Sequence, residues 1–156
     1  MILRGIKFIS IGKEKYNIIS PEKITKKIDQ QKFREFINLH KDVFLWDEET
    51  VKGQKTLEII DTFSVKETIP MQMNQFRAYA FYKKEKGYYG LDVAWVAEWG
   101  IILVNFNNSR ISVPALEILL DMANYCEAML LVNGQKQITK EFIDKEKNEI
   151  EEKKKK

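Results

Sequence analysis

Carboxylates are the residues of this 156-residue chain that could most readily perform chemistry. Asp61 interrupts the apolar side of one alternating segment, and Asp92 and Glu98 flank a tryptophan in another. Two carboxyl groups on one face of a sheet can serve as general acid and general base. Asp and Glu nevertheless lie mostly at protein surfaces. We therefore expect these three side chains on the solvent-facing side of a sheet and not in an active site.

Other patterns that accompany catalysis are missing from the sequence. The single histidine, His40, recurs with the apolar positions of a helix, and the single cysteine, Cys126, falls in the most apolar helical segment. One His and one Cys far apart do not form a zinc-ligand signature. The seven glycines occur singly, without the spacing of a phosphate-binding loop. We expect no enzyme activity, no metal and no cofactor, with Cys126 buried as a small apolar residue.

Segment 88–99 combines two of the three tryptophans with two of the six tyrosines. Such residues provide large contact areas at low entropic cost and dominate binding hot spots. Trp95 shares a side with Leu91 and Val93, which favours a position in the core. For Trp99 and Tyr89, the pattern is equally consistent with a core and with a surface position. The predicted partner-binding surface comprises Tyr88, Tyr89, Asp92, Glu98 and Trp99. Its aromatic and acidic character suits a basic region of a partner protein.

The preceding alternating segment offers an alternative, because its basic and aromatic side chains could stack on single-stranded bases. This nucleic-acid face would comprise Arg77, Tyr79, Lys83 and Lys84. A strand between two packed layers with a charged hairpin tip would show the same pattern. The location of the positive charge argues against the alternative. The net charge of the chain is +3, but residues 153–156 are four lysines, and the remainder has a net charge of −1. A globular nucleic-acid binder carries its basic excess on a folded face.

No pattern typical of a secretion signal or a membrane span occurs in the sequence. Arg4 and Lys7 interrupt the apolar residues near the start, and uninterrupted apolar runs, such as 128–132, are at most five residues long. A lone cysteine is typical of a reducing compartment. We expect a cytoplasmic protein without a membrane partner, and the sequence leaves its oligomeric state open.

Alternation of apolar and polar residues predicts strands over 2–11, 57–65, 76–83 and 91–97. Residues 101–106 are apolar on both sides, which predicts a central strand. Short apolar runs at 43–46 and 131–132 are candidate strands, and 16–19 could return beside the first strand as a hairpin. The short connections favour an antiparallel meander of about four to six strands.

Helical periodicity predicts a helix over 21–41, with Ser20 as its cap and Asp29 as a second cap at which the helix could break. A second helix is expected over 113–129 after Ser112, and a third after Thr139. The first two should pack on one face of the sheet. The fold class is therefore α+β, with one domain over 1–144 and a charged, frayed C-terminal helix end over 145–156.

Part of the sequence resembles the C-terminal strand–helix–strand unit of small bacterial immunity proteins. The resemblance covers about a quarter of the chain and rests on Trp99-Gly100-Ile101, on the 112–117 helix start and on Leu130 to Gly134. Members of that family neutralise a toxin by binding it directly. The resemblance implies a non-enzymatic bacterial protein, an immunity or inhibitor protein, that occludes a partner protein such as a toxin.

Overall fold

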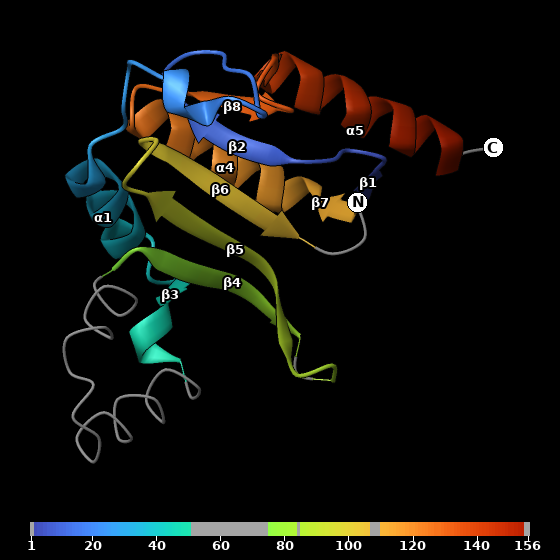
Figure 1. The fold of residues 1–156 in the computed structure, drawn as a ribbon. Helices are drawn as coiled ribbons and strands as arrows, with labels where there is room; N and C mark the ends of the chain where they lie inside the picture. Colours follow the sequence, from blue (N-terminus) through green and yellow to red (C-terminus); the bar gives the residue numbers. More distant parts are fainter. Residues whose placement is uncertain (1, 51–74, 84, 107–109, 155–156) are drawn as a thin grey trace.

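A computed structural model describes residues 2–50, 75–83, 85–106 and 110–154 (Figure 1). The predicted strand over 57–65 lies outside these residues, as do Asp61 and Lys84. The fold is α+β. The strands are β1 Ile2–Arg4, β2 Ile9–Gly12, β3 Phe44–Trp46, β4 Arg77–Lys83, β5 Tyr88–Val96, β6 Ile101–Phe106, β7 Arg110–Ser112, β8 Met129–Val132 and β9 Lys136–Ile138. The helices are α1 Gln30–Leu39, α4 Val113–Tyr125 and α5 Lys140–Lys154, with 3-10 turns η1 Pro21–Lys23 and η2 Asp47–Glu49.

Seven of these strands form one antiparallel sheet in the order β3-β4-β5-β6-β2-β8-β9. The β3–β6 part is the expected meander, and β6 occupies the predicted central position. β2 differs from the prediction because it inserts between β6 and β8. Ile9 aligns with Val104 on one side and with Val132 on the other. A separate two-stranded sheet pairs β1 with β7.

The predicted hairpin between 2–11 and 16–19 is wrong. Both edges of β2 are already occupied by β6 and β8, so a returning strand has no place beside it. Tyr16 instead donates its backbone N–H to the carbonyl of Gly134 at 2.9 Å, and its hydroxyl lies 2.6 Å from the hydroxyl of Ser10. The predicted first strand is also divided, because Gly5 has φ +82° between β1 and β2.

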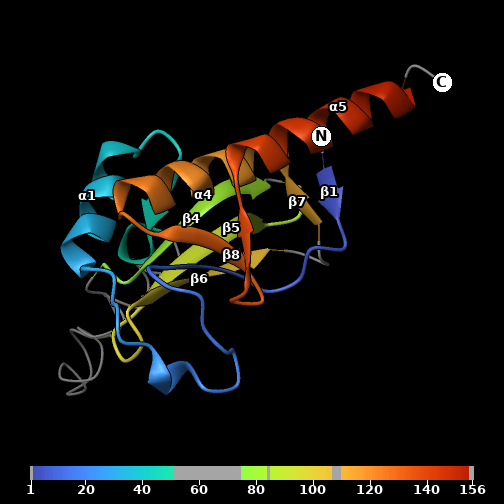
Figure 2. The same ribbon diagram turned by 90° about the horizontal axis from the view of Figure 1, so that it is seen from above.

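Helices α1, α4 and α5 lie on one side of the sheet, and residues 13–28 lie on the other (Figure 2). Alternation along the strands supplies both layers. Ile102 and Val104 of β6 join the core beneath the helices, whereas Ile101 and Leu103 join a smaller cluster beneath residues 13–28. Phe33, Phe36 and Ile37 of α1 and Leu116, Leu119 and Met122 of α4 are each at most 1% exposed. Burial of each such side chain contributes about 1.5–3 kcal/mol.

Local capping determines where the helices begin. Asp29 accepts the backbone N–H of Gln31 at 3.0 Å, which confirms the break in the predicted 21–41 helix. Ser112 accepts from Ala115, and Thr139 accepts from Phe142, each at 3.2 Å. Ser20 makes no side-chain cap bond, and only the η1 turn follows it.

α4 ends four residues before the predicted boundary at Met129. Glu127 adopts φ +54°, and the N–H of Ala128 bonds to the carbonyl of Ala123 at 2.8 Å. This is a Schellman termination, for which glycine is the usual residue. Because Glu127 occupies the left-handed position instead, the sequence contains no stop signal there.

α5 continues as helix from residue 140 to Lys154. The domain boundary at 144 and the fraying beyond it stay predictions.

Gly100 should be the least replaceable turn residue. It has φ +65°, and an added Cβ would lie 2.7 Å from the Cα of Lys27. Gly87, with φ +72°, has nothing within 4 Å of that position. We expect Gly87→Ala to cost about 1 kcal/mol of unfolding free energy for its left-handed conformation alone. Gly100→Ala should cost at least about 3 kcal/mol, because residues 24–28 must also move. Urea unfolding of both variants would test this, and equal losses would contradict the close contact between Gly100 and the backbone of Lys27.

Candidate functional site

The outer ends of β4 and β5 form a projecting hairpin, which we name the arm and which comprises residues 81–90. β3 pairs with β4 only at residues 78–80, and β6 pairs with β5 only from Leu91 onward. In the described part of the arm, the strand residues 81–83 and 88–90 therefore pair only with each other. Figure 1 shows this hairpin extending away from the body of the molecule. In the part of the chain that the structure describes, no further strand pairs with either edge of these residues.

Aromatic side chains cover the arm and its base. The ring of Tyr89 lies 5.1 Å from that of Tyr79 and 4.8 Å from that of Tyr82, centroid to centroid. Phe81 is 38% exposed, Tyr82 56% and Tyr88 36%. We name Tyr79, Tyr82 and Tyr89 the tyrosine cluster. Mutual ring contacts restrict the rotamers of these side chains, which lowers the entropy lost when a partner binds.

An irregular backbone at Phe81 and Gly90 brings the tyrosine cluster together. Tyr79 aligns with Asp92, so regular alternation would place Tyr89, three residues before Asp92, on the other face. Phe81 has φ +57°, and the Phe81–Gly90 pair is absent from the otherwise continuous register. A Cβ at Gly90 would lie 3.3 Å from the carbonyl oxygen of Phe81, so a glycine allows this close approach. The resulting distortion permits the Tyr79–Tyr89 contact.

At the base of the arm, Asp92 is held by neighbouring side chains. Asn105 donates to its Oδ1 at 2.9 Å, and the Nε of Arg77 lies 4.0 Å from the same oxygen. Burial raises the pKa of Asp92 above its ordinary range, whereas the Asn105 hydrogen bond and the Arg77 charge act in the opposite direction. Because these contacts engage its carboxylate, Asp92 orients the base of the arm.

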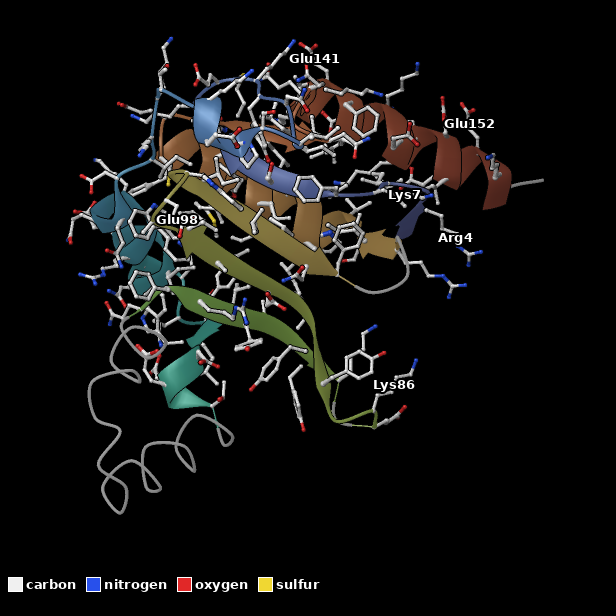
Figure 3. All side chains as sticks on the ribbon, in the orientation of Figure 1. Arg4, Lys7, Lys86, Glu98, Glu141 and Glu152 are labelled. Atoms are coloured by element: carbon white, nitrogen blue, oxygen red, sulfur yellow. The ribbon has the colours of Figure 1, made fainter. Side chains whose placement is uncertain are left out.

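The structure divides the predicted partner-binding surface. Tyr88 and Tyr89 belong to the arm, whereas Glu98 lies in the β5–β6 turn, far from Lys86 at the arm's tip (Figure 3). Trp99 packs with Tyr16 and the rest of the smaller apolar cluster beneath residues 13–28. Its indole is thus partly buried by intramolecular packing. The predicted set therefore does not form one continuous patch.

Trp95 is likewise engaged within the fold. Its indole N–H donates to the carbonyl of Ile28 at 3.0 Å, and its ring stacks on Phe76 at 5.9 Å between centroids. It is partly buried and packs against the main core, as its alternation indicated. The arm is therefore the surface on which the aromatic side chains of this region stay accessible.

The two predicted sets overlap in space. Arg77, Tyr79 and Lys83 of the nucleic-acid alternative share β4, and the Nζ of Lys83 lies 5.8 Å from the ring centroid of Tyr88. The sequence pattern placed Tyr79 and Tyr89 on different predicted surfaces, grouped Phe81 with the basic and aromatic face, and did not indicate Tyr82 or Asn105. The exposed aromatic pair at 81–82, next to a charged turn, was the signal that could have identified the arm.

His40 and Cys126 have structural roles. Nδ1 of His40 donates to the carbonyl oxygen of Phe36 at 2.8 Å, and its ring stacks on Phe36. Cys126 is buried, and this burial raises its pKa to about 11, which disfavours the nucleophilic thiolate.

Among the described residues there is no cluster of His, Cys, Asp and Glu suited to a metal ion. Across those same ranges, every helix is too short or too polar to cross a bilayer.

Comparisons of the chain with protein-family models, with curated proteins and with solved structures return no match.

We expect the stability cost of Asp92 to depend on pH. Burial raises the pKa of Asp92 in the folded state. Protonation of its carboxyl therefore stabilises the fold fully below the unfolded-state pKa, and this stabilisation is lost as pH rises through the folded-state pKa. Asp92→Asn should therefore raise the free energy of unfolding relative to wild type at neutral pH. The difference should shrink below the ordinary pKa of 3.8. Urea unfolding at both pH values would measure it, and a pH-independent difference would contradict the burial of this charge.

Proposed function

We propose that this chain is a non-enzymatic bacterial protein of the cytoplasm that inhibits a partner protein by direct occlusion, as an immunity protein does. The observation that supports the proposal is the arm, where Phe81, Tyr82 and Tyr88 are 36–56% exposed beside mutually packed tyrosines. Aromatic side chains held in this way resemble the hot spots of protein interfaces. A projecting hairpin can enter a cleft of its partner and block access to it.

The charge of the arm favours an acidic partner surface. Lys83, Lys84 and Lys86 outnumber Glu85, the one acidic residue between 81 and 90. Glu98 is remote from the arm, and Asp92 is engaged by Arg77 and Asn105. We therefore replace the expected basic partner region by an acidic one, which would also accelerate association electrostatically.

Packing within the arm favours a protein partner over a nucleic acid. The rings of Tyr79 and Tyr82 contact that of Tyr89, so part of the ring surface needed for base stacking is already covered. The Nε of Arg77 lies 4.0 Å from Oδ1 of Asp92, which offsets part of the positive charge beside Tyr79. Nucleic-acid binding through Arg77, Tyr79, Lys83 and Lys84 stays the alternative that an experiment must separate.

Site-specific photocrosslinking in a native cell extract tests the proposal. A photoreactive benzoyl-phenylalanine replaces Tyr82 on the arm or, as the control, Leu39 on α1, which is 66% exposed. We expect a defined adduct from position 82 alone, sensitive to protease and resistant to nuclease. A nuclease-sensitive adduct would support the alternative, and identical adducts from both positions would refute a binding role for the arm.

Alanine substitutions then measure the contribution of the arm to affinity for the crosslinked partner. Tyr82→Ala and Tyr88→Ala should each weaken binding at least about tenfold, as expected for interface hot spots. Leu39→Ala is the matched exposed control and should leave affinity unchanged. Isothermal titration calorimetry gives the affinities, and thermal unfolding verifies that each variant is folded. Unchanged affinity in both tyrosine variants would contradict the proposal.

A further inference from the structure

Positive charge is segregated along this chain. Residues 13–28 contain five basic and two acidic side chains, a net charge of +3, whereas residues 29–152 contain 15 basic and 21 acidic side chains, a net charge of −6. Residues 13–28 cover the face of the sheet opposite to the helices (Figure 2). Residues 13–28, which we name the basic layer, therefore differ in charge from residues 29–152, and Figure 1 shows that they are separate from the arm.

Two exposed isoleucines form the apolar part of this layer. Ile18 is 43% exposed and Ile19 is 84% exposed. The backbone N–H of Ile19 donates to the side-chain oxygen of Asn17 at 2.9 Å, and that of Ser20 donates to the carbonyl of Asn17 at 3.0 Å. These bonds form a tight turn with both isoleucines at its tip. We name Ile18 and Ile19 the isoleucine tip.

The tip is anchored to the turn between β8 and β9. Tyr16 donates its N–H to the carbonyl of Gly134 at 2.9 Å, and the side-chain amide of Gln135 donates to the carbonyl of Tyr16 at 2.6 Å. The backbone carbonyl of Phe8 accepts the N–H of Asn133 at 2.9 Å, so Phe8 contacts the same turn. Its side chain is 42% exposed. The backbones of Phe8 and Tyr16 are thus both hydrogen-bonded to the β8–β9 turn, and Tyr16 is two residues before Ile18.

Lysines flank the tip in the sequence, and the neighbouring carboxylate Glu14 is engaged elsewhere. Glu14 accepts the backbone N–H groups of Thr25 at 2.6 Å and of Lys26 at 3.3 Å. The exposed lysines of this layer are Lys15, Lys23, Lys26 and Lys27. Glu22 is the exposed acidic residue among 7–28. The layer therefore combines aliphatic tips with an excess of lysine.

We propose that this basic layer is a docking surface for an anionic lipid bilayer, with the isoleucine tip inserted at the headgroup boundary. Aliphatic side chains at a turn can enter the acyl boundary while surrounding lysines contact anionic headgroups. Each lysine near such a surface increases affinity about fivefold. Binding at the surface requires no membrane-spanning helix, so the proposal is compatible with the helices described above.

The composition of the layer favours lipid over other acidic partners. Protein hot spots are rich in Trp, Tyr and Arg, whereas this layer presents Ile and Lys. Single-stranded nucleic acid binding uses a series of exposed aromatic faces for stacking, whereas Phe8 is the one exposed aromatic side chain among the described residues 2–28. The long aliphatic stems of lysine also allow the ammonium groups to reach headgroups from a partly inserted backbone.

Vesicle co-sedimentation of the full chain tests the proposal. We expect binding to phosphatidylcholine vesicles that contain phosphatidylserine and none to phosphatidylcholine vesicles alone. The double variant Ile18→Ser/Ile19→Ser should lower affinity for anionic vesicles at least about tenfold, because it removes the inserted apolar surface. Leu39→Ser is the matched control, since Leu39 is also exposed but belongs to α1, and it should bind like wild type.

Charge variants and a polyanion separate lipid docking from general electrostatic attraction. Lys15→Glu/Lys23→Glu should weaken vesicle binding, whereas Lys145→Glu on α5 should affect it much less. Thermal unfolding verifies that every variant is folded. Equal vesicle binding by wild type and the double isoleucine variant would overturn the proposal. Tighter binding to heparin or to polyuridylate RNA than to anionic vesicles would overturn it in favour of a polyanion site.

Discussion

The insertion of β2 between β6 and β8 is the interaction on which the rest of the structure depends. It joins the β3–β6 meander to the β8–β9 hairpin, and Ile9 and Ile11 are at most 1% exposed beneath the helices. On the opposite face, the buried Ser10 hydroxyl lies 2.6 Å from that of Tyr16 and thereby holds residues 13–28 against the sheet. One short strand thus organises both layers, although it pairs only with strands distant in sequence.

This framework leaves two accessible surfaces of different chemistry. The arm extends beyond the strands that flank it and presents tyrosines with lysines at the tip. Residues 13–28 present aliphatic side chains and lysines on the face opposite to the helices. Tyrosine provides rigid, amphipathic contacts suited to a protein, whereas isoleucine and lysine suit the lipid boundary. The two surfaces could therefore serve separate partners without competing.

Errors in the predicted boundaries arose where long-range contacts determine the backbone. Residues 16–19 have strand-like composition, but the edges of β2 are occupied, so Tyr16 bonds to the β8–β9 turn. α4 ends through a left-handed Glu127, for which the sequence carries no glycine signal. The tyrosine cluster depends on the irregular backbone at Phe81, which period-two alternation does not foresee.

The sequence by itself determined the α+β class, the caps at Asp29 and Ser112, the central position of β6 and the burial of Cys126. These features depend on residue periodicity and on hydrogen bonds within a few residues. Only the tertiary structure decided that Glu98 and the arm lie apart and that Tyr79 meets Tyr89. The physical reason is that periodicity specifies which face of an element a side chain occupies. Its neighbours across that face depend on strand order, register and local backbone distortion.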